Sequence, residues 1–365
     1  MKITEEAILK ALGTVEDPDL KQDLVTLGMI KNVKSEEGKV SFTVELTTPA
    51  CPLKEIIRKE CIKAIEAISE EKVEVSIDIT SNVTSVRKES PLLPDVKNII
   101  AVASGKGGVG KSTVTANLAV ALAKSGAKVG VIDADIFGPS MPTMFGCEYE
   151  QPKMIKTDDV TLITPIEQFG IKLISIGLLI KKDNPMVWRG PVASSALKQF
   201  IGDTEWGSLD YLLIDLPPGT SDIHLTLVQS VPVTGAIIVT TPQKVALEDA
   251  KKGLLMFKQK QIDVPILGIV ENMSYFMSDE NPNDKQYVFG KGGGAGLAKK
   301  EDVPLLAEIP LMQSIRESCD EGFPVTMEDN SITDIFMELS QSVARQVAIR
   351  NATKTPTEVV EVTKQ

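Results

Sequence analysis

Short apolar runs alternate with longer amphipathic segments over residues 98–349. The short runs are rich in β-branched residues, as in buried parallel strands, and the longer segments repeat apolar positions at helical spacing. This alternation predicts an α/β domain with a doubly wound, mostly parallel sheet and helices on both faces. The runs that predict its strands are residues 98–104, 128–133, 210–215, 235–241 and 264–270.

Residues 1–85 have a different pattern and predict a separate, small α/β domain. Helical spacing and alternation both occur there, each in short stretches that end in polar turns. The predicted elements are a helix at 4–15 capped by Thr4, two strands around a polar turn within 28–47, a second helix at 51–68 and a third strand at 72–80.

Two polar segments border the larger domain. Residues 86–97 lose the periodicity and contain two prolines, so they predict a linker. Residues 350–365 are polar, threonine-rich and mixed in charge. We expect them to form a disordered tail.

A phosphate-binding loop follows the first predicted strand of the larger domain. The sequence from Gly105 to Ser112 fits the pattern G-x-x-x-x-G-K-[ST] without a mismatch, and a helical pattern comes next. Its glycines allow backbone N–H groups to face an anion at the positive end of a helix. Lys111 should then reach the β and γ phosphates of ATP, with Ser112 on Mg²⁺. The predicted nucleotide contacts in this loop are Gly105, Lys106, Gly107, Gly108, Val109, Gly110, Lys111, Ser112 and Thr113.

Three aspartates stand at the ends of predicted strands. Asp133 and Asp135 follow one apolar run, and Asp215 ends another. Ligands bind at the carboxyl ends of strands in open α/β sheets, so these carboxylates should lie near the phosphates. Asp215 is predicted to hold magnesium through water. A strand-end aspartate is often only a cap, but several in the expected chain order favour a site.

Lys106 is not needed by an ordinary phosphate loop, and with it the sequence resembles the deviant Walker A ATPases, the class of MinD, ParA and the nitrogenase iron protein. The resemblance implies that Lys106 crosses a homodimer interface to the partner's nucleotide; a solvated surface lysine is the alternative. It implies that Asp135 is the switch aspartate that positions the attacking water. Asn272, in the sequence ENMS, resembles the class's adenine-recognising asparagine.

Longer motifs narrow the resemblance to the Mrp/ApbC family of iron-sulfur cluster carriers. They include VWRGP with Trp188 and Arg189, DIFGPSMPTMFG after Asp135, and ENMSYF. The sequences DPDL, LGMI and TTPACPL resemble the metal-sulfur cluster assembly domain that many such carriers possess. The family implies a slow ATPase that uses ATP and Mg²⁺ and passes iron-sulfur clusters to apoprotein clients.

The chain departs from that family at the cluster ligands. The family's C-x-x-C follows ENMSYF, but Ser278 and Asn281 stand at those positions here, and neither supplies a thiolate. A nucleotide-switched scaffold that holds no cluster is therefore the alternative function. The cysteines present, which show no C-x-x-C spacing, are Cys51, Cys61, Cys147 and Cys319.

Cys51 is the cysteine with the most suggestive setting. It lies where a strand gives way to a helix, and Pro52 suits a first helical turn. A helix N-terminus lowers a thiol pKa, so Cys51 is predicted to be a thiolate or a cluster ligand. A small buried residue at a tight turn is the alternative.

Composition excludes some partners. The formal net charge of -11 argues against nonspecific binding of nucleic acid, which needs clustered Lys and Arg. No apolar run approaches the ~18 residues of a membrane span, and residues 350–365 lack a basic amphipathic helix. The acidic, helical start is unlike a signal peptide. We expect a cytoplasmic protein without membrane or nucleic-acid partners.

Overall fold

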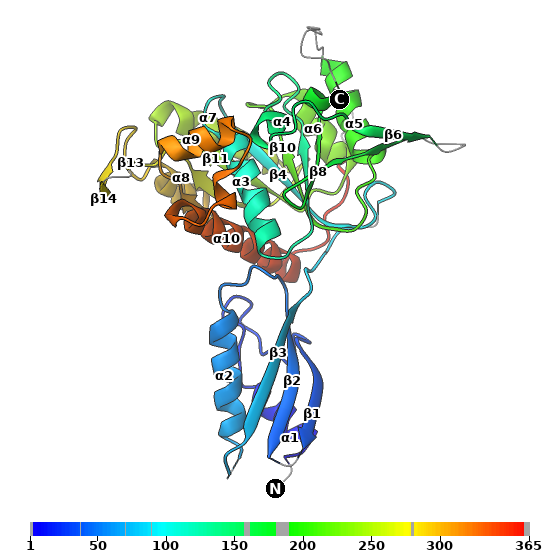
Figure 1. Cartoon of the computed structure of the whole chain (residues 1–365), viewed down its shortest axis with the longest axis vertical. Helices are drawn as coiled ribbons and strands as arrows, with labels where there is room; N and C mark the ends of the chain where they lie inside the picture. The colour runs from blue at the N-terminus through cyan, green and yellow to red at the C-terminus, as the bar shows by residue number, and fades with distance from the viewer. Residues whose placement is uncertain are drawn as a thin grey trace. The chain divides into compact units, whose positions relative to one another are not determined.

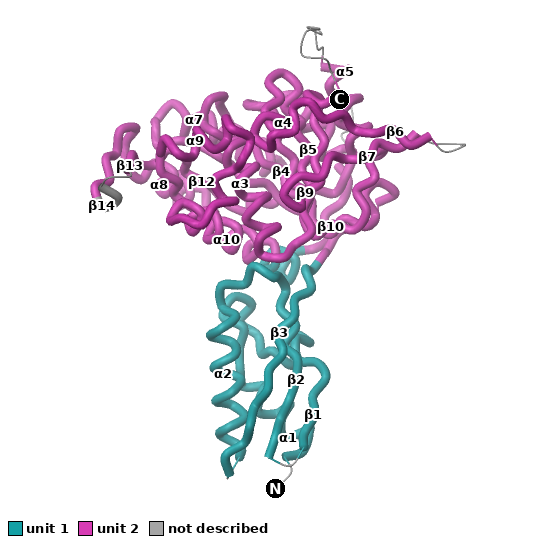
Figure 2. The backbone as a smooth tube through the Cα atoms, viewed as in Figure 1, with its two compact units in different colours: residues 1–84, 348–354 teal, residues 85–347, 355–365 magenta. Residues whose placement is uncertain are grey.

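The computed structural model describes residues 3–36, 38–69, 71–88, 90–156, 161–179, 190–278 and 281–360, and only the backbone at 278 and 281–283. The chain forms two compact units (Figure 2). The first comprises residues 1–84 and 348–354, and the second comprises residues 85–347 and 355–365.

The first unit is a three-stranded sheet with two helices. β1 and β2 pair antiparallel, and β3 joins β2 in parallel after the crossover that contains α2. Ile8, Phe42 and Ile65 are among the side chains buried in its core. The small α/β domain expected from the sequence is therefore confirmed. Its elements are α1 (Glu5–Leu12), β1 (Ile30–Glu36), β2 (Lys39–Leu46), α2 (Lys54–Glu66) and β3 (Glu74–Ser81).

The second unit is built on an eight-stranded sheet of order β15-β12-β11-β4-β10-β5-β9-β8. All neighbouring strands are parallel except β8, which pairs antiparallel with β9. The five strands predicted from the apolar runs are β4 (Val96–Ser104), β5 (Val129–Asp133), β10 (Leu209–Asp215), β11 (Gly235–Thr240) and β12 (Ile266–Glu271). The doubly wound sheet is thus confirmed.

Helices cover both faces of this sheet (Figure 1). Leu197, Leu227 and Phe257 bring three of them onto a common core with fully buried strand residues such as Ile99 and Ile214. None of the helices in the described ranges is long and apolar enough to cross a membrane. The helices are α3 (Lys111–Lys124), α4 (Met141–Met144), α5 (Gly190–Gly202), α6 (Asp222–Ser230), α7 (Lys244–Phe257), α8 (Gly293–Glu301), α9 (Gln313–Asp320) and α10 (Ser331–Thr353), with 3₁₀ turns η1 (Ile176–Leu178) and η2 (Val325–Met327).

Several short strands escaped the sequence pattern. They have three to six residues each, too few to show a period, and β8 lies at the sheet edge. Two antiparallel ribbons, β6-β7 and β13-β14, stand apart from the main sheet. The missed strands are β6 (Lys153–Lys156), β7 (Thr161–Thr164), β8 (Ile166–Gln168), β9 (Ile171–Ser175), β13 (Phe276–Ser278), β14 (Asn281–Gln286) and β15 (Leu305–Glu308).

The segments expected to be linker and tail carry regular contacts. β4 begins at Val96, inside the predicted linker. α10 continues to Thr353, Thr357 forms a β-bridge with Arg87, and the Val360 N–H donates to the Val228 carbonyl at 2.9 Å. Val360 also packs against the core of the second unit. The expected disorder is therefore wrong for residues 350–360, because main-chain pairing and an apolar contact hold a segment whose composition is polar.

Candidate nucleotide site

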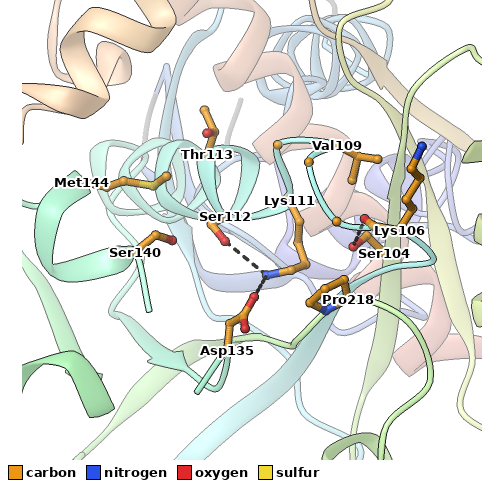
Figure 3. Close-up of a pocket in the computed structure, with 13 residues that line it drawn as sticks. Ser104, Lys106, Val109, Lys111, Ser112, Thr113, Asp135, Ser140, Met144 and Pro218 are labelled. Carbon is orange, nitrogen blue, oxygen red and sulfur yellow. Dashed lines mark hydrogen bonds and ion pairs between the residues drawn. The ribbon is translucent and has the colours of Figure 1, made fainter. Parts of the chain in front are cut away.

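The candidate site forms where three adjacent strands end. β4, β10 and β5 are neighbours in the sheet, and their carboxyl ends lead into the phosphate loop, Asp215 and Asp133. Asp215 and Asp133 are direct cross-strand partners. A cavity of about 220 Å³ opens here, lined by the loop together with Asp135, Ser140 and Pro218 (Figure 3).

Two loop glycines are required by their surroundings. A Cβ on Gly105 would lie 2.1 Å from the Asp249 carbonyl oxygen of α7. Gly110 has a φ of +77°, and a Cβ there would lie 2.2 Å from Nδ2 of Asn272. Because neither neighbour leaves space, only glycine lets the loop turn into α3 at Lys111.

A buried ion pair joins the start of α3 to the end of β10. Lys111 Nζ lies 2.6 Å from Asp215 Oδ2, and the two side chains are 6% and 0% exposed. Ser112 Oγ donates to the same oxygen at 2.6 Å, and Thr115 Oγ1 donates to Oδ1 at 2.8 Å. The groups expected to bind phosphate and magnesium are thus hydrogen-bonded to one another.

The other two aspartates have raised pKa values. Burial and the neighbouring Asp215 charge raise the pKa of Asp133 to about 7. Burial also raises the pKa of Asp135, although Lys111, with Nζ 3.9 Å from Asp135 Oδ2, opposes that shift. Asp135 lines the cavity, so a carboxylate faces the place where the terminal phosphate should lie.

Asn272 contacts the loop, while Lys106 is turned away from the cavity centre. The buried Asn272 amide donates to the Val109 carbonyl at 2.9 Å. Lys106 is exposed, and its side chain points away from Lys111 and Asp135 (Figure 3). The structure therefore brings Asn272 to the loop but does not bring the Lys106 amine to Lys111 and Asp135.

Sequence reasoning missed two polar residues of the site. Thr115 lies four residues after Lys111, so helical periodicity alone could have placed it on the same face as Lys111. Ser140 lines the cavity, and its hydroxyl is buried without a hydrogen-bond partner among the described residues. No spacing signal pointed to Ser140, because it follows an irregular loop.

The donor set fits magnesium. The Ser112 and Ser140 hydroxyls and the Asp135 and Asp215 carboxylates are hard oxygen ligands, and Mg²⁺ is commonly bound by one or two carboxylates together with substrate phosphates. Within the described ranges, no group of three or more His, Cys, Asp or Glu side chains could hold a metal by itself. Magnesium at this site would therefore depend on nucleotide oxygens.

The prediction for Cys51 was wrong in the direction of its pKa. Helix α2 begins only at Lys54, so Pro52 precedes the helix. Burial raises the pKa of the Cys51 thiol, the Asp17 and Asp19 charges add to the shift, and hydrogen bonding to backbone N–H groups offsets it only in part.

The other three cysteines also have raised thiol pKa values, so they form the thiolate less readily than an ordinary cysteine does. Burial raises the pKa of Cys61 and of Cys147 to about 12, and raises that of Cys319. All four cysteines are free.

Two of the motifs that carry the resemblance to cluster carriers can be located in the fold. Trp188 and Arg189 lie outside the described residues, while Gly190 begins α5. Ser278 and Asn281 are cross-strand backbone partners in the β13-β14 hairpin. These are the two positions at which the resemblance to the carrier family implies cysteines.

Two known families match the chain in succession. Residues 95–348 match the family described as NUBPL iron-transfer P-loop NTPase, and residues 5–77 match the family described as iron-sulfur cluster assembly protein. The first match includes every residue of the nucleotide site, and the second includes Cys51.

Curated relatives are similar over most of the chain. The iron-sulfur cluster carrier protein of Synechocystis is 47% identical over 95% of this chain and 99% of its own length. The protein of the same name from Escherichia coli K12 is 44% identical over 92% of this chain and 90% of its own length. The chloroplastic Fe-S cluster assembly factor HCF101 of Arabidopsis thaliana is 41% identical over 94% of this chain, which corresponds to 64% of that protein.

A solved structure resembles the second unit. A nucleotide-binding protein from Archaeoglobus fulgidus, solved in complex with ADP, is 39% identical, with a TM-score of 0.57. The match covers 67% of this chain and 93% of that chain. It supports a P-loop fold for the part of the chain that carries the site.

The raised pKa of Cys51 predicts slow alkylation at neutral pH, because only the thiolate attacks iodoacetamide. Its rate, followed by peptide mass spectrometry, should stay below that of N-acetylcysteine and keep rising beyond the ordinary thiol pKa of about 8.5. Cys61 in the same unit, which is fully buried, should react only after unfolding and serves as the internal control. A Cys51 profile that levels off near neutral pH would show the low-pKa thiolate instead.

Proposed function

Because the chain belongs to the family of NUBPL iron-transfer P-loop NTPases, we propose that it is an ATP-hydrolysing carrier that binds iron-sulfur clusters and passes them to apoproteins. One observation carries the proposal: similarity to iron-sulfur cluster carrier proteins extends over 95% of the chain, across both units and the complete nucleotide site. We place the carrier in the cytoplasm, where thiols stay reduced.

Nucleotide binding is proposed to proceed by exchange of partners. Lys111 would leave Asp215 and bind the terminal phosphates. The Ser112 hydroxyl would turn from Asp215 toward magnesium. Asp215, freed from these donors, would hold the ion through water. Magnesium would supply neutralisation of charge on the phosphate oxygens. The 2.6 Å contacts that join Lys111 and Ser112 to Asp215 hold these three side chains together and support this exchange.

Hydrolysis is proposed to use Asp135 to orient water. The water oxygen would bond to the γ-phosphorus while the bond between that phosphorus and the bridging oxygen breaks, leaving ADP and phosphate. Asp135 lines the cavity beside Lys111, which supports this role. Since no other carboxylate among the described residues lines the cavity, Asp135 is the group placed to accept a hydrogen bond from water. We expect slow turnover.

A homodimer is proposed to complete the site. Lys106 is exposed and points away from Lys111 and Asp135 of its own chain, as expected for a lysine that acts on the nucleotide of a second copy. A cation supplied in trans can raise phosphoryl-transfer rates by about 10³ to 10⁵. Asn272, which lies against the loop, is proposed to contact the adenine once nucleotide enters.

The cluster would be cargo, and its ligands would have to come from the thiols that this chain contains. Cluster binding needs thiolates, yet each of the four thiols has a raised pKa, and Ser278 and Asn281 replace the family's cysteines. These facts favour a second candidate: a nucleotide-switched scaffold that binds client proteins without holding iron. Cys51, the only partly exposed thiol, is the candidate ligand if a cluster is carried.

The Asp135→Asn variant should bind ATP with nearly unchanged affinity but lose hydrolysis by roughly 10² or more, because a water-orienting group acts mainly in the transition state. Calorimetry and single-turnover assays measure the two quantities. Lys111→Ala is the contrasting variant, and it should lose affinity because the cation on the terminal phosphates is gone. Wild-type turnover in Asp135→Asn would remove Asp135 from the mechanism.

Lys106→Ala should weaken ATP-dependent dimerisation and lower hydrolysis together, if Lys106 acts across the dimer. Sedimentation with a slowly hydrolysed ATP analogue measures dimerisation. Lys260→Ala, which removes another exposed lysine outside the cavity lining, is the matched control and should behave as wild type. Normal dimerisation and turnover of Lys106→Ala would leave it a solvated surface lysine.

Anaerobic reconstitution with iron and sulfide tests cluster carriage. A carrier should retain iron, show a sulfur-to-iron charge-transfer band and pass the cluster to an apoprotein; Cys51→Ser should lose most of the iron and Cys147→Ser should keep it. Loss in Cys319→Ser with retention in Cys51→Ser would move the ligand to the second unit. Negligible iron in wild type and all variants would reject carriage through these cysteines and favour the scaffold.

A further inference from the structure

The carboxylate of Asp133 collects hydrogen bonds from the loop that follows it. Asp133 ends β5 and is fully buried. Its Oδ1 accepts the N–H of Asp135 at 3.2 Å, and its Oδ2 accepts the N–H groups of Ser140 and Met141 at 3.1 and 3.2 Å. Oδ2 also accepts the Ser175 hydroxyl at 2.9 Å. One side chain therefore ties both ends of residues 135–141 to the sheet.

The loop residues that line the nucleotide cavity are among those hydrogen-bonded to Asp133. In the segment between β5 and α4, the cavity is lined by Asp135 and Ser140, and both donate their N–H to Asp133. The middle of the segment is bound differently: Gly138 donates to the Asp135 carbonyl at 3.2 Å, and Phe137 is 62% exposed. Asp133 itself does not line the cavity.

The end of β9 supports the same carboxylate. Ser175 Oγ accepts the Gly177 N–H at 3.1 Å while it donates to Asp133. Gly177 in turn lies under the loop, since a Cβ there would be 3.2 Å from Pro142 and 3.3 Å from Pro139. The end of β9 thus adds one further donor to the carboxylate, beside the three loop N–H groups, and Pro139 of the loop lies close to Gly177.

We infer that Asp133 is a positioning residue for ATP hydrolysis: its carboxylate holds the backbone of Asp135 and Ser140, and so sets their side chains against the nucleotide. The inference rests on the proposed ATPase function. Asp135 can orient water only from a fixed position, and a displacement of about 1 Å at a reacting centre can cost about 10²-fold in rate. Holding Ser140 also keeps its buried, unpartnered hydroxyl beside the cavity, where a ligand oxygen or bound water could satisfy it.

The Asp133→Asn variant tests the inference with little change of shape. An amide NH₂ replaces one carboxylate oxygen, so a donor then faces the N–H donors of the loop. Some of the hydrogen bonds that hold residues 135–141 are therefore lost. We expect kcat to fall between about tenfold and about a hundredfold, with KM for ATP changed by less than about threefold, because the hydrogen bonds that Asp133 accepts come from the following loop and from Ser175 and not from the phosphate loop.

Ser175→Ala is the matched control. It removes one donor from Asp133 and leaves the three loop N–H groups in place, so its kcat should stay within about twofold of wild type. A folded Asp133→Asn protein with wild-type kcat, beside a wild type that hydrolyses ATP, would overturn the inference. So would a loss in Ser175→Ala as large as that in Asp133→Asn, because the effect would then belong to core packing.

Amide hydrogen exchange gives a readout that does not depend on hydrolysis. In nucleotide-free wild type, the N–H groups of Asp135, Ser140 and Met141 should be protected, and Asp133→Asn should lose that protection while the β5 amides keep theirs. Free exchange of these N–H groups in wild type would overturn the inference even if the variant failed to fold. Absence of hydrolysis by wild type would instead overturn the proposed function, and the exchange data would still decide whether Asp133 holds the loop.

Discussion

The ion pair between Lys111 and Asp215 is the interaction on which the second unit's site depends. Both groups are almost fully removed from water, where an unpaired charge would cost several kcal/mol. The pair persists because Ser112 and Thr115 also donate to the carboxylate, so the first turn of α3 satisfies the end of β10. The side chains expected to hold the phosphates and magnesium are therefore bonded to each other. In the proposed binding step, these charge-assisted contacts would be exchanged for contacts with the nucleotide and magnesium.

The same anion shapes its neighbour. Asp133 lies opposite Asp215 in the sheet, and burial together with that charge raises its pKa to about 7. Two carboxylates on adjacent strand ends are tolerable because they have different donors. Asp215 takes the cation and hydroxyls of α3, while Asp133 takes backbone N–H groups of the following loop and the Ser175 hydroxyl. The end of β10 thus binds the residues proposed to contact the ligand, and the end of β5 binds the loop that follows it.

The features predicted correctly from the sequence are those that depend on residues close together in the chain. The phosphate loop, its strand and its helix are contiguous, so their order fixed the positions of Lys111 and Ser112, and the apolar runs predicted β4, β5, β10, β11 and β12. Other features depend on distant partners. Ser175, which donates to Asp133, lies on β9, a strand too short to show a period. The pKa of Cys51 is raised by burial and by Asp17 and Asp19, which lie far from it in the sequence. Polar composition likewise gave no sign that Val360 would bond to Val228.

The glycines of the phosphate loop carry less information about ATP than their motif suggests. Gly105 is required by the backbone of α7 at Asp249, and Gly110 by the side chain of Asn272, and both of these neighbours belong to the protein itself. A descendant that had lost nucleotide binding but kept this fold would still be selected to retain both glycines. Pattern matching would continue to report such a chain as an ATPase. Substitutions at Lys111 and Ser112 would be the better indicators that nucleotide binding had been lost.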